Sequence, residues 1–256
     1  MKLLALAFCI FISCGAAVES YGEGGKVLKW MKASGMRIQG LKATATLLQK
    51  SPKGAFRGDA YVFFKAPSSV RIDILGPADN MVGSFVSRKG KGLIVDYMAG
   101  RTLSASDSSC LFSEFLGIDM VLPGFSAIFM GSPPVIKFDE SELTANSKGY
   151  TILSLRDNSA GVDEKMQVVQ GKYGTAVIRA VVLKDQKKVV DISFRGRGWK
   201  IEDLPLMPRV VEAAFIEEKL QMLLKYRKVE INTNISDDVF DVQIPPEFPL
   251  QTVECE

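Results

Sequence analysis

Residues Leu111–Gly131, LFSEFLGIDMVLPGFSAIFMG, form the longest strongly apolar run outside the extreme N-terminus. Apolar side chains in its first half recur at helical spacing, after a possible N-cap at Ser106 or Asp107. Pro123 suits the first turn of a second helix, which Gly131 would end. Two short apolar helices need an apolar surface to cover. The sequence leaves open whether that surface is a filled core or a cavity.

The segments around this run alternate apolar and polar residues with a period of two, which is typical of β-strands with one buried face. Short turns rich in glycine, proline and asparagine separate them, so the pattern predicts an antiparallel meander rather than a βαβ sheet. The expected strands span residues 41–47, 56–65, 70–74, 81–88, 93–98, 135–137, 150–155, 165–170, 176–183, 189–194, 209–215, 222–232 and 239–244.

A sheet of this size cannot leave its apolar face bare. The helices within Leu111–Gly131 and an amphipathic helix over Lys26–Ser34 are its obvious covers. We therefore expect a mainly β fold with short helices: an unclosed, strongly curved antiparallel half-barrel, covered by helices, in a single domain over residues 26–256. Such a geometry often encloses a ligand cavity.

The N-terminal residues fit the pattern of an export signal. One lysine precedes a short apolar run, too short to span a bilayer, and the run ends in FISCG. This ending resembles a bacterial lipobox, which predicts a signal peptide over residues 1–13, acylation of Cys14 and a polar tether over residues 14–25. Two or more acyl chains, such as palmitate, anchor a protein stably to a membrane. Ordinary cleavage near Ala16 or Ala17 is the alternative.

Two further cysteines, Cys110 and Cys255, follow the expected tether. In an oxidising compartment they either form one disulfide or remain two free thiols, and spacing alone does not decide between these.

The composition argues against several kinds of chemistry. The chain has no histidine, which removes Ser-His and Cys-His catalysis and histidine-based zinc sites. Its net charge of +3 does not indicate nucleic acid as a partner. Carboxylates at Asp139–Glu142, Glu217–Glu218 and Asp237–Asp238 lack the spacing of a calcium loop, so solvated turns are the favoured reading. We expect no enzyme activity, no metal and no cofactor beyond the lipid on Cys14.

Four segments, in this order and spacing, resemble motifs of the LolA/LolB lipoprotein carriers and receptors, and the chain is most similar to a LolB-like lipoprotein. Ser68–Gly90 resembles a strand–loop–strand hairpin, and Leu111–Pro134 resembles the helical segment. Leu204–Phe215 resembles a strand that begins with Met-Pro, and Asp237–Phe248 resembles the Phe-Pro ending. The resemblance implies a monomer anchored by lipid to the outer membrane and facing the periplasm. It also implies a periplasmic carrier protein as partner.

The resemblance further implies an apolar cavity that binds the acyl chains of lipoproteins and assists their localisation or insertion. The cavity and lid residues expected on this basis are Phe63, Ile72, Ile74, Phe112, Phe115, Phe125, Ile128 and Phe129. Plain core packing is the alternative for each of them.

A membrane-contacting loop is also implied, with Met81 and Val82 as its apolar residues. The sequence departs from the receptor after Pro77, where Ala78-Asp79-Asn80 replaces an apolar residue. The alternative function is a lipid-binding, sensory or structural envelope lipoprotein without transfer activity.

Overall fold

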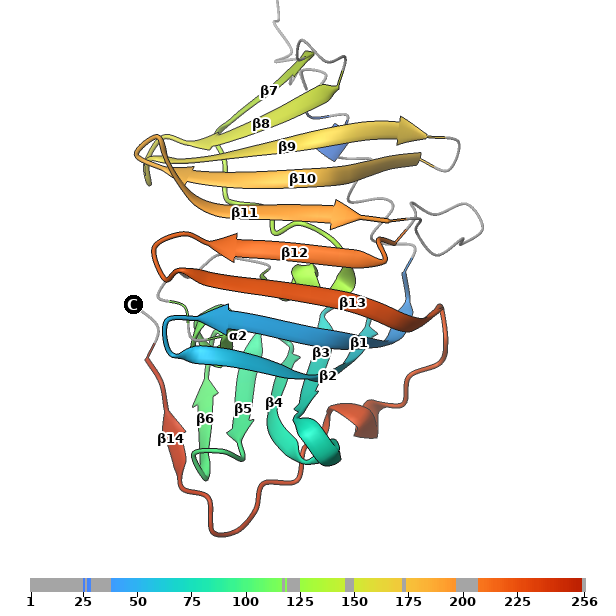
Figure 1. The fold of residues 1–256 in the computed structure, drawn as a ribbon, viewed down its shortest axis with the longest axis vertical. Coiled ribbons are helices and arrows are strands. Elements are labelled where there is room, and N and C mark those ends of the chain that lie inside the picture. Colours follow the sequence, from blue (N-terminus) through green and yellow to red (C-terminus); the bar gives the residue numbers. More distant parts are fainter. Residues whose placement is uncertain are drawn as a thin grey trace, which may run out of the picture.

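The computed structural model describes residues 25, 27–28, 38–116, 118, 125–145, 150–171, 174–196 and 207–254. These residues contain fourteen strands that belong to one sheet (Figure 1). The strands are β1 (Gly40–Ser51), β2 (Gly54–Lys65), β3 (Ser69–Leu75), β4 (Met81–Arg88), β5 (Lys91–Asp96), β6 (Arg101–Ala105), β7 (Glu140–Ala145), β8 (Thr151–Asp157), β9 (Val162–Gly171), β10 (Gly174–Lys184), β11 (Lys187–Arg195), β12 (Val210–Phe215), β13 (Leu220–Ile231) and β14 (Leu250–Thr252).

The sheet joins two antiparallel meanders. Its order is β14-β6-β5-β4-β3-β2-β1-β13-β12-β11-β10-β9-β8-β7, so β1 pairs with both β2 and β13 at the centre. Only the short β14 runs parallel to its neighbour β6. Strands β4–β6 stand upright in Figure 1 while β7–β13 lie across the view, which shows how strongly the sheet curls. The expected unclosed, curved antiparallel half-barrel is confirmed.

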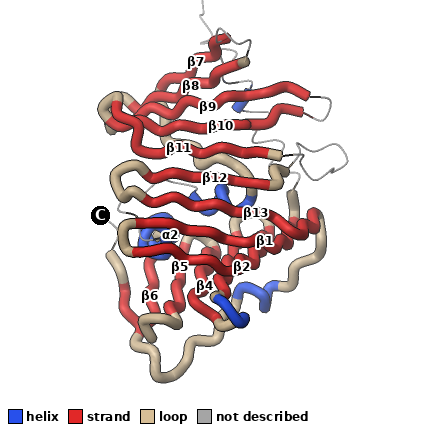
Figure 2. Tube along the Cα trace, viewed as in Figure 1, coloured by secondary structure: helices blue, strands red, loops and turns tan. Residues whose placement is uncertain are grey.

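Helical segments cover the inner face of the sheet. The α-helix α2 (Ser108–Leu116) lies over β4, β5 and β6, and the 3-10 helix η2 (Phe125–Met130) lies nearer the centre (Figure 2). Gly25, Val27 and Leu28 are helical, but the rest of the expected helix over Lys26–Ser34 lies outside the described residues. No helix within the described ranges has the length and apolar character needed to cross a membrane.

Local chemistry explains why α2 begins and packs where it does. The Oδ1 atom of Asp107 accepts a hydrogen bond from the backbone N–H of Ser109 at 2.8 Å, which caps the helix as expected. Two glycines in the strands then allow α2 to approach the sheet closely. A Cβ atom at Gly92 would lie 2.8 Å from Leu111 Cδ1, and one at Gly83 would lie 3.2 Å from Phe115 Cε2. The helix therefore packs almost directly on the backbone of β4 and β5.

The second covering segment, η2, is anchored to β13. The buried hydroxyl of Tyr226 donates hydrogen bonds to the carbonyl oxygens of Ile128, at 3.3 Å, and Phe129, at 3.0 Å. Burial raises the pKa of this hydroxyl above its ordinary value. Gly131 ends η2 with φ of 70°, a conformation that favours glycine. The predicted stop at Gly131 is confirmed.

A C-terminal strap, residues 232–254, crosses the opposite, outer face of the sheet. It carries the 3-10 helix η3 (Asp237–Phe240), whose Phe240 packs in a small cluster with Val86 and Ile235. Arg71 donates a hydrogen bond to the carbonyl oxygen of Val239 at 2.7 Å.

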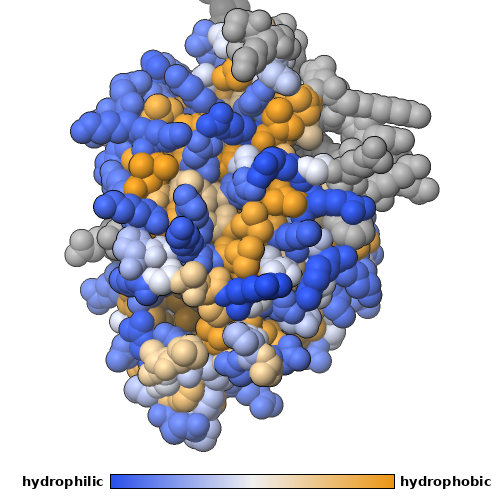
Figure 3. All heavy atoms as spheres, viewed as in Figure 1, coloured by the Kyte–Doolittle hydropathy of each residue, from blue (hydrophilic) through white to orange (hydrophobic). Residues whose placement is uncertain are grey.

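The view in Figure 3 shows a mixed surface, with hydrophobic residues between charged ones and a hollow with hydrophobic walls near its lower left.

Two predicted strands were wrong, and three strands were missed. Residues 135–137 form no strand, because the backbone N–H of Ile136 bonds to the side chain of Glu164 instead of a neighbouring strand. Residues 239–244 contain the end of η3 and irregular chain, since the segment bonds to the outer face through side chains. Strands β6, β7 and β14 were not predicted. They are short, and the burial patterns of β7 and β14 show almost no buried residue.

Candidate functional site

A cavity of about 250 Å³ lies between the last turn of α2 and the inner face of β1–β6. Alternate residues of the strands form its apolar floor, and Phe115 and Leu116 of α2 form its roof. The lining residues are Leu47, Gln49, Phe56, Ile74, Val82, Gly83, Ile94, Asp96, Arg101, Leu103, Glu114, Phe115 and Leu116. A largely apolar cavity with a few polar groups is the usual form of a small-molecule site.

Polar side chains connect α2 to the sheet beside this cavity. Arg101 of β6 bonds through Nη2 to the Oε1 atom of Glu114 on α2, at 3.0 Å. Its Nε atom lies 3.6 Å from Asp96 Oδ2 and, within the described part of the chain, is buried without a hydrogen-bond partner. Gln49 of β1 donates to the carbonyl oxygen of Leu116 at 3.4 Å. These partly exposed contacts are weak individually, about 0–1 kcal/mol for such an ion pair.

The opposite end of α2 is held more firmly. The backbone N–H of Ser108 donates to the carbonyl oxygen of Gly90 at 2.8 Å, and the hydroxyls of Ser87 and Ser108 lie 2.9 Å apart. Cys110 is disulfide-bonded, with a partner outside the described residues. The first turn of α2 is therefore held by a backbone hydrogen bond and a disulfide, and the last turn by side-chain contacts.

The structure divides the expected cavity and lid residues into separate groups. Ile74 and Phe115 line the cavity. Four others are at most 1% exposed and belong to the filled core: Ile72, Phe112, Ile128 and Phe129. The ring of Phe112 lies edge-to-face against Phe85 at 4.9 Å and against Phe129 at 5.8 Å. The side chain of Phe125 lies outside the described part of the chain.

Phe63 was misplaced by the sequence reading. It packs with the outer-face cluster under the strap, because Val62 and Phe64, its neighbours on β2, face the inner core. A strand places successive side chains on opposite faces, so Phe63 cannot reach the cavity.

The expected membrane-contacting residues lie at the start of β4. Met81 and Val82 are both half-buried, and Val82 lines the cavity. The 3-10 helix η1 (Pro77–Asp79) before them is exposed, and Ala78 and Asp79 there have positive φ angles of 64° and 58°.

Sequence reasoning missed much of the cavity lining, including Leu47, Ile94 and Leu103, and all of the polar contacts beside it. Arg101 could have been found from its position, because it follows the turn Tyr97–Gly100 and so pairs with Asp96 across that turn. That signal was unusable because β6 itself was not predicted.

A buried carboxyl group, Glu164, lies in the core away from the cavity lining. It is 0% exposed, and its Oε2 atom accepts a hydrogen bond from the backbone N–H of Ile136 at 3.1 Å. Its Oε1 atom has no hydrogen-bond partner among the described residues. Burial raises the pKa of Glu164 to about 8.

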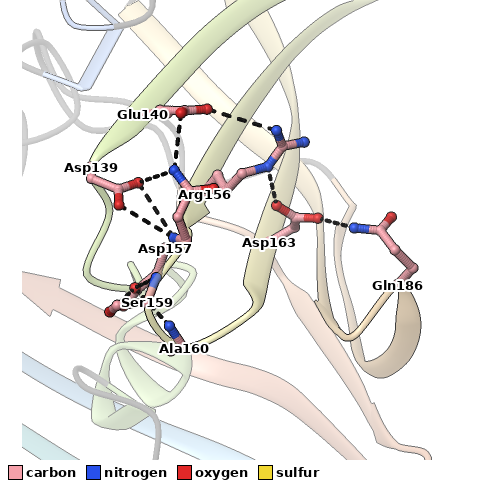
Figure 4. A network of polar contacts seen from close by, with 9 residues as sticks. Asp139, Glu140, Arg156, Asp157, Ser159, Ala160, Asp163 and Gln186 are labelled. Atoms are coloured by element: carbon pink, nitrogen blue, oxygen red, sulfur yellow. Dashed lines mark hydrogen bonds and ion pairs between the residues drawn. The ribbon is translucent and has the colours of Figure 1, made fainter.

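The adjacent carboxyl group, Asp163, behaves in the opposite way. It belongs to the polar network in Figure 4, where Arg156 Nε lies 2.8 Å from Asp163 Oδ1 and Gln186 Nε2 donates to Oδ2 at 2.6 Å. The hydrogen bond from Arg156 holds the pKa of Asp163 below its ordinary value. Glu140 lies 3.7 Å from the same guanidinium. No group of three potential metal ligands occurs within the described ranges.

A second, shallower groove of about 850 Å³ lies across β10–β13 and the β1–β2 hairpin. Leu48 and Leu223 contribute apolar surface, and the Arg179–Asp191 ion pair, at 2.7 Å, contributes charge. This groove is larger than the cavity under α2 but more open to solvent.

An open antiparallel sheet that curls around covering helices defines the lipoprotein-carrier fold of the LolA type. Solved structures with this fold match most of the chain at low sequence identity. A DUF1329 family protein from Desulfovibrio piger matches with a TM-score of 0.63 and 15% identity, over 85% of this chain and 95% of that chain. An outer membrane lipoprotein-sorting protein domain from Vibrio parahaemolyticus matches with a TM-score of 0.58 and 10% identity, over 85% and 97%.

A LolA superfamily protein from Nitrosomonas europaea matches with a TM-score of 0.51 and 11% identity, over 82% of this chain and 94% of that chain. No protein-family model matches the chain, and no curated protein matches its sequence. The likeness therefore concerns the fold. The predicted acylation site, Cys14, and the C-terminal cysteine, Cys255, lie outside the described residues.

Proposed function

We propose that this protein binds the acyl chains of lipoproteins in the cavity under α2 and assists their localisation or insertion at the bacterial outer membrane. It acts without enzymatic chemistry and is anchored by lipid on Cys14. The observation that carries the proposal is the largely apolar cavity, whose roof residues, Phe115 and Leu116, pack on the sheet beside a few partly exposed polar contacts. Its fold, which lipoprotein-sorting and LolA-superfamily structures share, supports the same reading.

The cavity volume determines how a chain would enter. About 250 Å³ is below the roughly 300–1,000 Å³ of ordinary ligand sites, so the closed form has room for part of one acyl chain. Each buried methylene contributes about 0.8 kcal/mol, so a few methylenes together exceed what the Arg101–Glu114 ion pair contributes. We therefore expect binding to displace the last turn of α2, while Ser108 and Cys110 hold the first turn in place.

A cavity-filling substitution tests this proposal. Val82→Trp places an indole in the cavity, whereas Val181→Trp adds the same side chain to a half-buried position on β10 that does not line it. Native mass spectrometry of protein purified from the envelope should find acyl chains on the wild type and on Val181→Trp, and few or none on Val82→Trp. Equal occupancy of the three proteins would contradict the proposal.

The second candidate is a structural or sensory envelope lipoprotein without transfer activity. The complete burial of Phe112, Ile128 and Phe129 favours it, because these residues fill much of the space that a large ligand would need. A lipoprotein-transfer assay with a purified periplasmic carrier separates the two functions. The first predicts transfer to membranes, and the second predicts none, with or without bound lipid.

A further inference from the structure

A disulfide bond holds the first turn of α2, and the described part of the chain indicates which cysteine completes it. Cys110 is disulfide-bonded, and the sequence contains three other cysteines: Cys9, Cys14 and Cys255. Removal of the expected signal peptide would remove Cys9, and the expected lipid would occupy the sulfur of Cys14. Elimination therefore favours Cys255, and the path of the C-terminal residues provides an independent argument.

The last described residues of the strap run toward Cys110. Strand β14 pairs in parallel with β6, with Thr252 opposite Ser104, and in Figure 1 the two strands run side by side toward α2. The backbone N–H of Val253 continues this pairing with a hydrogen bond to the carbonyl oxygen of Ser104 at 2.8 Å. Val253 and Cys110 also pack against the same hydrophobic core. The C-terminus and the first turn of α2 are thus neighbours.

Extension of the parallel register brings the two cysteines to one place. Because Thr252 lies opposite Ser104, the same register would set Cys255 opposite Asp107. The Sγ atom of Cys110 lies 3.4 Å from the carbonyl oxygen of Asp107. Neighbouring strands lie about 4.8 Å apart, which is within the roughly 4.4–6.8 Å that separate the Cα atoms of bridged cysteines. The register therefore suits a disulfide between the C-terminus and α2.

We propose that Cys110 and Cys255 form a disulfide that fastens the C-terminal strap to the first turn of α2. The two thiols lose two electrons and two protons as the S–S bond forms. A disulfide-containing oxidant of the cell envelope accepts them and becomes a dithiol, through exchange between thiolate and disulfide. Such an oxidising compartment is the one that the export signal predicts.

The cross-link reinforces a short strand at the edge of the sheet. All three residues of β14 are exposed, and the strand pairs only with β6 within the described sheet. The disulfide closes a loop that runs from α2 through β7–β14, and long closed loops gain most from such a bond. It also holds Ser108 and Cys110 in place if the last turn of α2 moves. That consequence rests on the proposed function, whereas the pairing of the cysteines does not.

Peptide mapping tests the pairing directly. Full-length protein purified from the envelope is alkylated without reduction and digested with trypsin, which places Cys110 in residues 102–137 and Cys255 in residues 229–256. Mass spectrometry should find the two peptides as one species, lighter than their sum by two hydrogen atoms, that separates on reduction. Alkylation of Cys110 as a free thiol, or its linkage to Cys14, would overturn the inference. A dimer on a non-reducing gel, linked through Cys255 of a second copy, would overturn it too.

Hydrogen exchange tests whether the bond fastens the strap. In Cys255→Ser, and in the matched variant Cys110→Ser, exchange in residues 250–254 should become about tenfold faster, because β14 opens more often without the cross-link. Peptides from β13 should exchange as in the wild type and so show that the fold is intact. Dithiothreitol should have the same effect on the wild type and none on the variants. Unchanged exchange in residues 250–254 after reduction and in both variants would overturn the fastening role.

The proposed function is judged separately by co-purified acyl chains. Acyl chains on a protein whose Cys110 is a free thiol would leave that function standing and reject the disulfide. A linked pair of peptides from a protein without acyl chains would support the disulfide and count against the proposed function.

Discussion

Replacement of Glu164 by Gln should make the protein more stable at high pH, because it removes an ionisable group that the fold buries. The folded-state pKa of about 8 lies above the ordinary value of 4.5. The stability associated with the protonated carboxyl is therefore fully present below pH 4.5 and is lost as the pH rises to about 8. One pKa unit corresponds to about 1.4 kcal/mol. Between pH 5 and pH 8 the free energy of unfolding of the wild type should therefore fall by about 3 kcal/mol, and that of Glu164→Gln should not fall for this reason.

Urea unfolding at several pH values between 5 and 8 measures this effect. Gln retains an acceptor for the backbone N–H of Ile136, and any constant cost of its amide N–H groups cancels when the two proteins are compared across pH. The free energy of unfolding of Glu164→Gln relative to wild type should rise by about 3 kcal/mol over this range. Parallel pH profiles for the two proteins would refute the reasoning.

The neighbouring carboxyl group supplies a control of opposite sign. The pKa of Asp163 is lowered by its hydrogen bond from Arg156, so its stabilising contribution is present at neutral pH and is lost as the pH falls. Asp163→Asn should therefore be less stable than wild type at pH 7, with the difference shrinking in acid. If removing any carboxylate from β9 had the same effect, the stability of both variants relative to wild type would change with pH in the same direction.

Three further perturbations address the covering segments and the anchor. Tyr226→Phe removes the hydroxyl that holds η2 and should lower the free energy of unfolding by about 1–2 kcal/mol in urea; a variant as stable as wild type would mean that this bond does not fix η2. Arg101→Gln should cost less than about 1 kcal/mol of stability but speed the uptake of a fluorescent fatty acid, because Glu114 is released; unchanged uptake would argue against opening at this turn. Cys14→Ala should move the protein from the membrane to the soluble fraction, and membrane retention at high salt would show that acylation is not its anchor.

The sheet and its covers could be predicted because period-two and helical patterns are local. Leu41, Ala43, Ala45 and Leu47 are all at most 3% exposed on one face, as their alternation indicated. The cap at Asp107 was equally local.

The errors arose where long-range contacts override local pattern. Val135 and Ile136 are β-branched, yet the partner of Ile136 is the side chain of Glu164, on a strand formed later in the chain. Asp237–Phe240 is held by the outer face through Arg71 and Lys65. Neither partner can be identified from the segment itself.

The sequence left open whether α2 covers a filled core or a cavity, and the family resemblance implied a cavity without giving its lining. Aromatic and branched residues at helical or strand spacing serve equally in a filled core and in a cavity lining, so Phe112 and Phe115, three residues apart, could not be told apart by sequence. Which of them faces open space depends on Gly83 and Gly92, which set how closely α2 approaches the sheet.

Mapping where an acyl chain binds is the most direct test of the central claim. A lipoprotein whose acyl chains carry a photoreactive diazirine is mixed with the full-length protein, irradiated, and the cross-linked residues are identified by mass spectrometry. The account predicts cross-links to Ile74, Leu103 and Phe115 under α2. Cross-links confined to the outer groove at Leu48 and Leu223, or none above background, would contradict it.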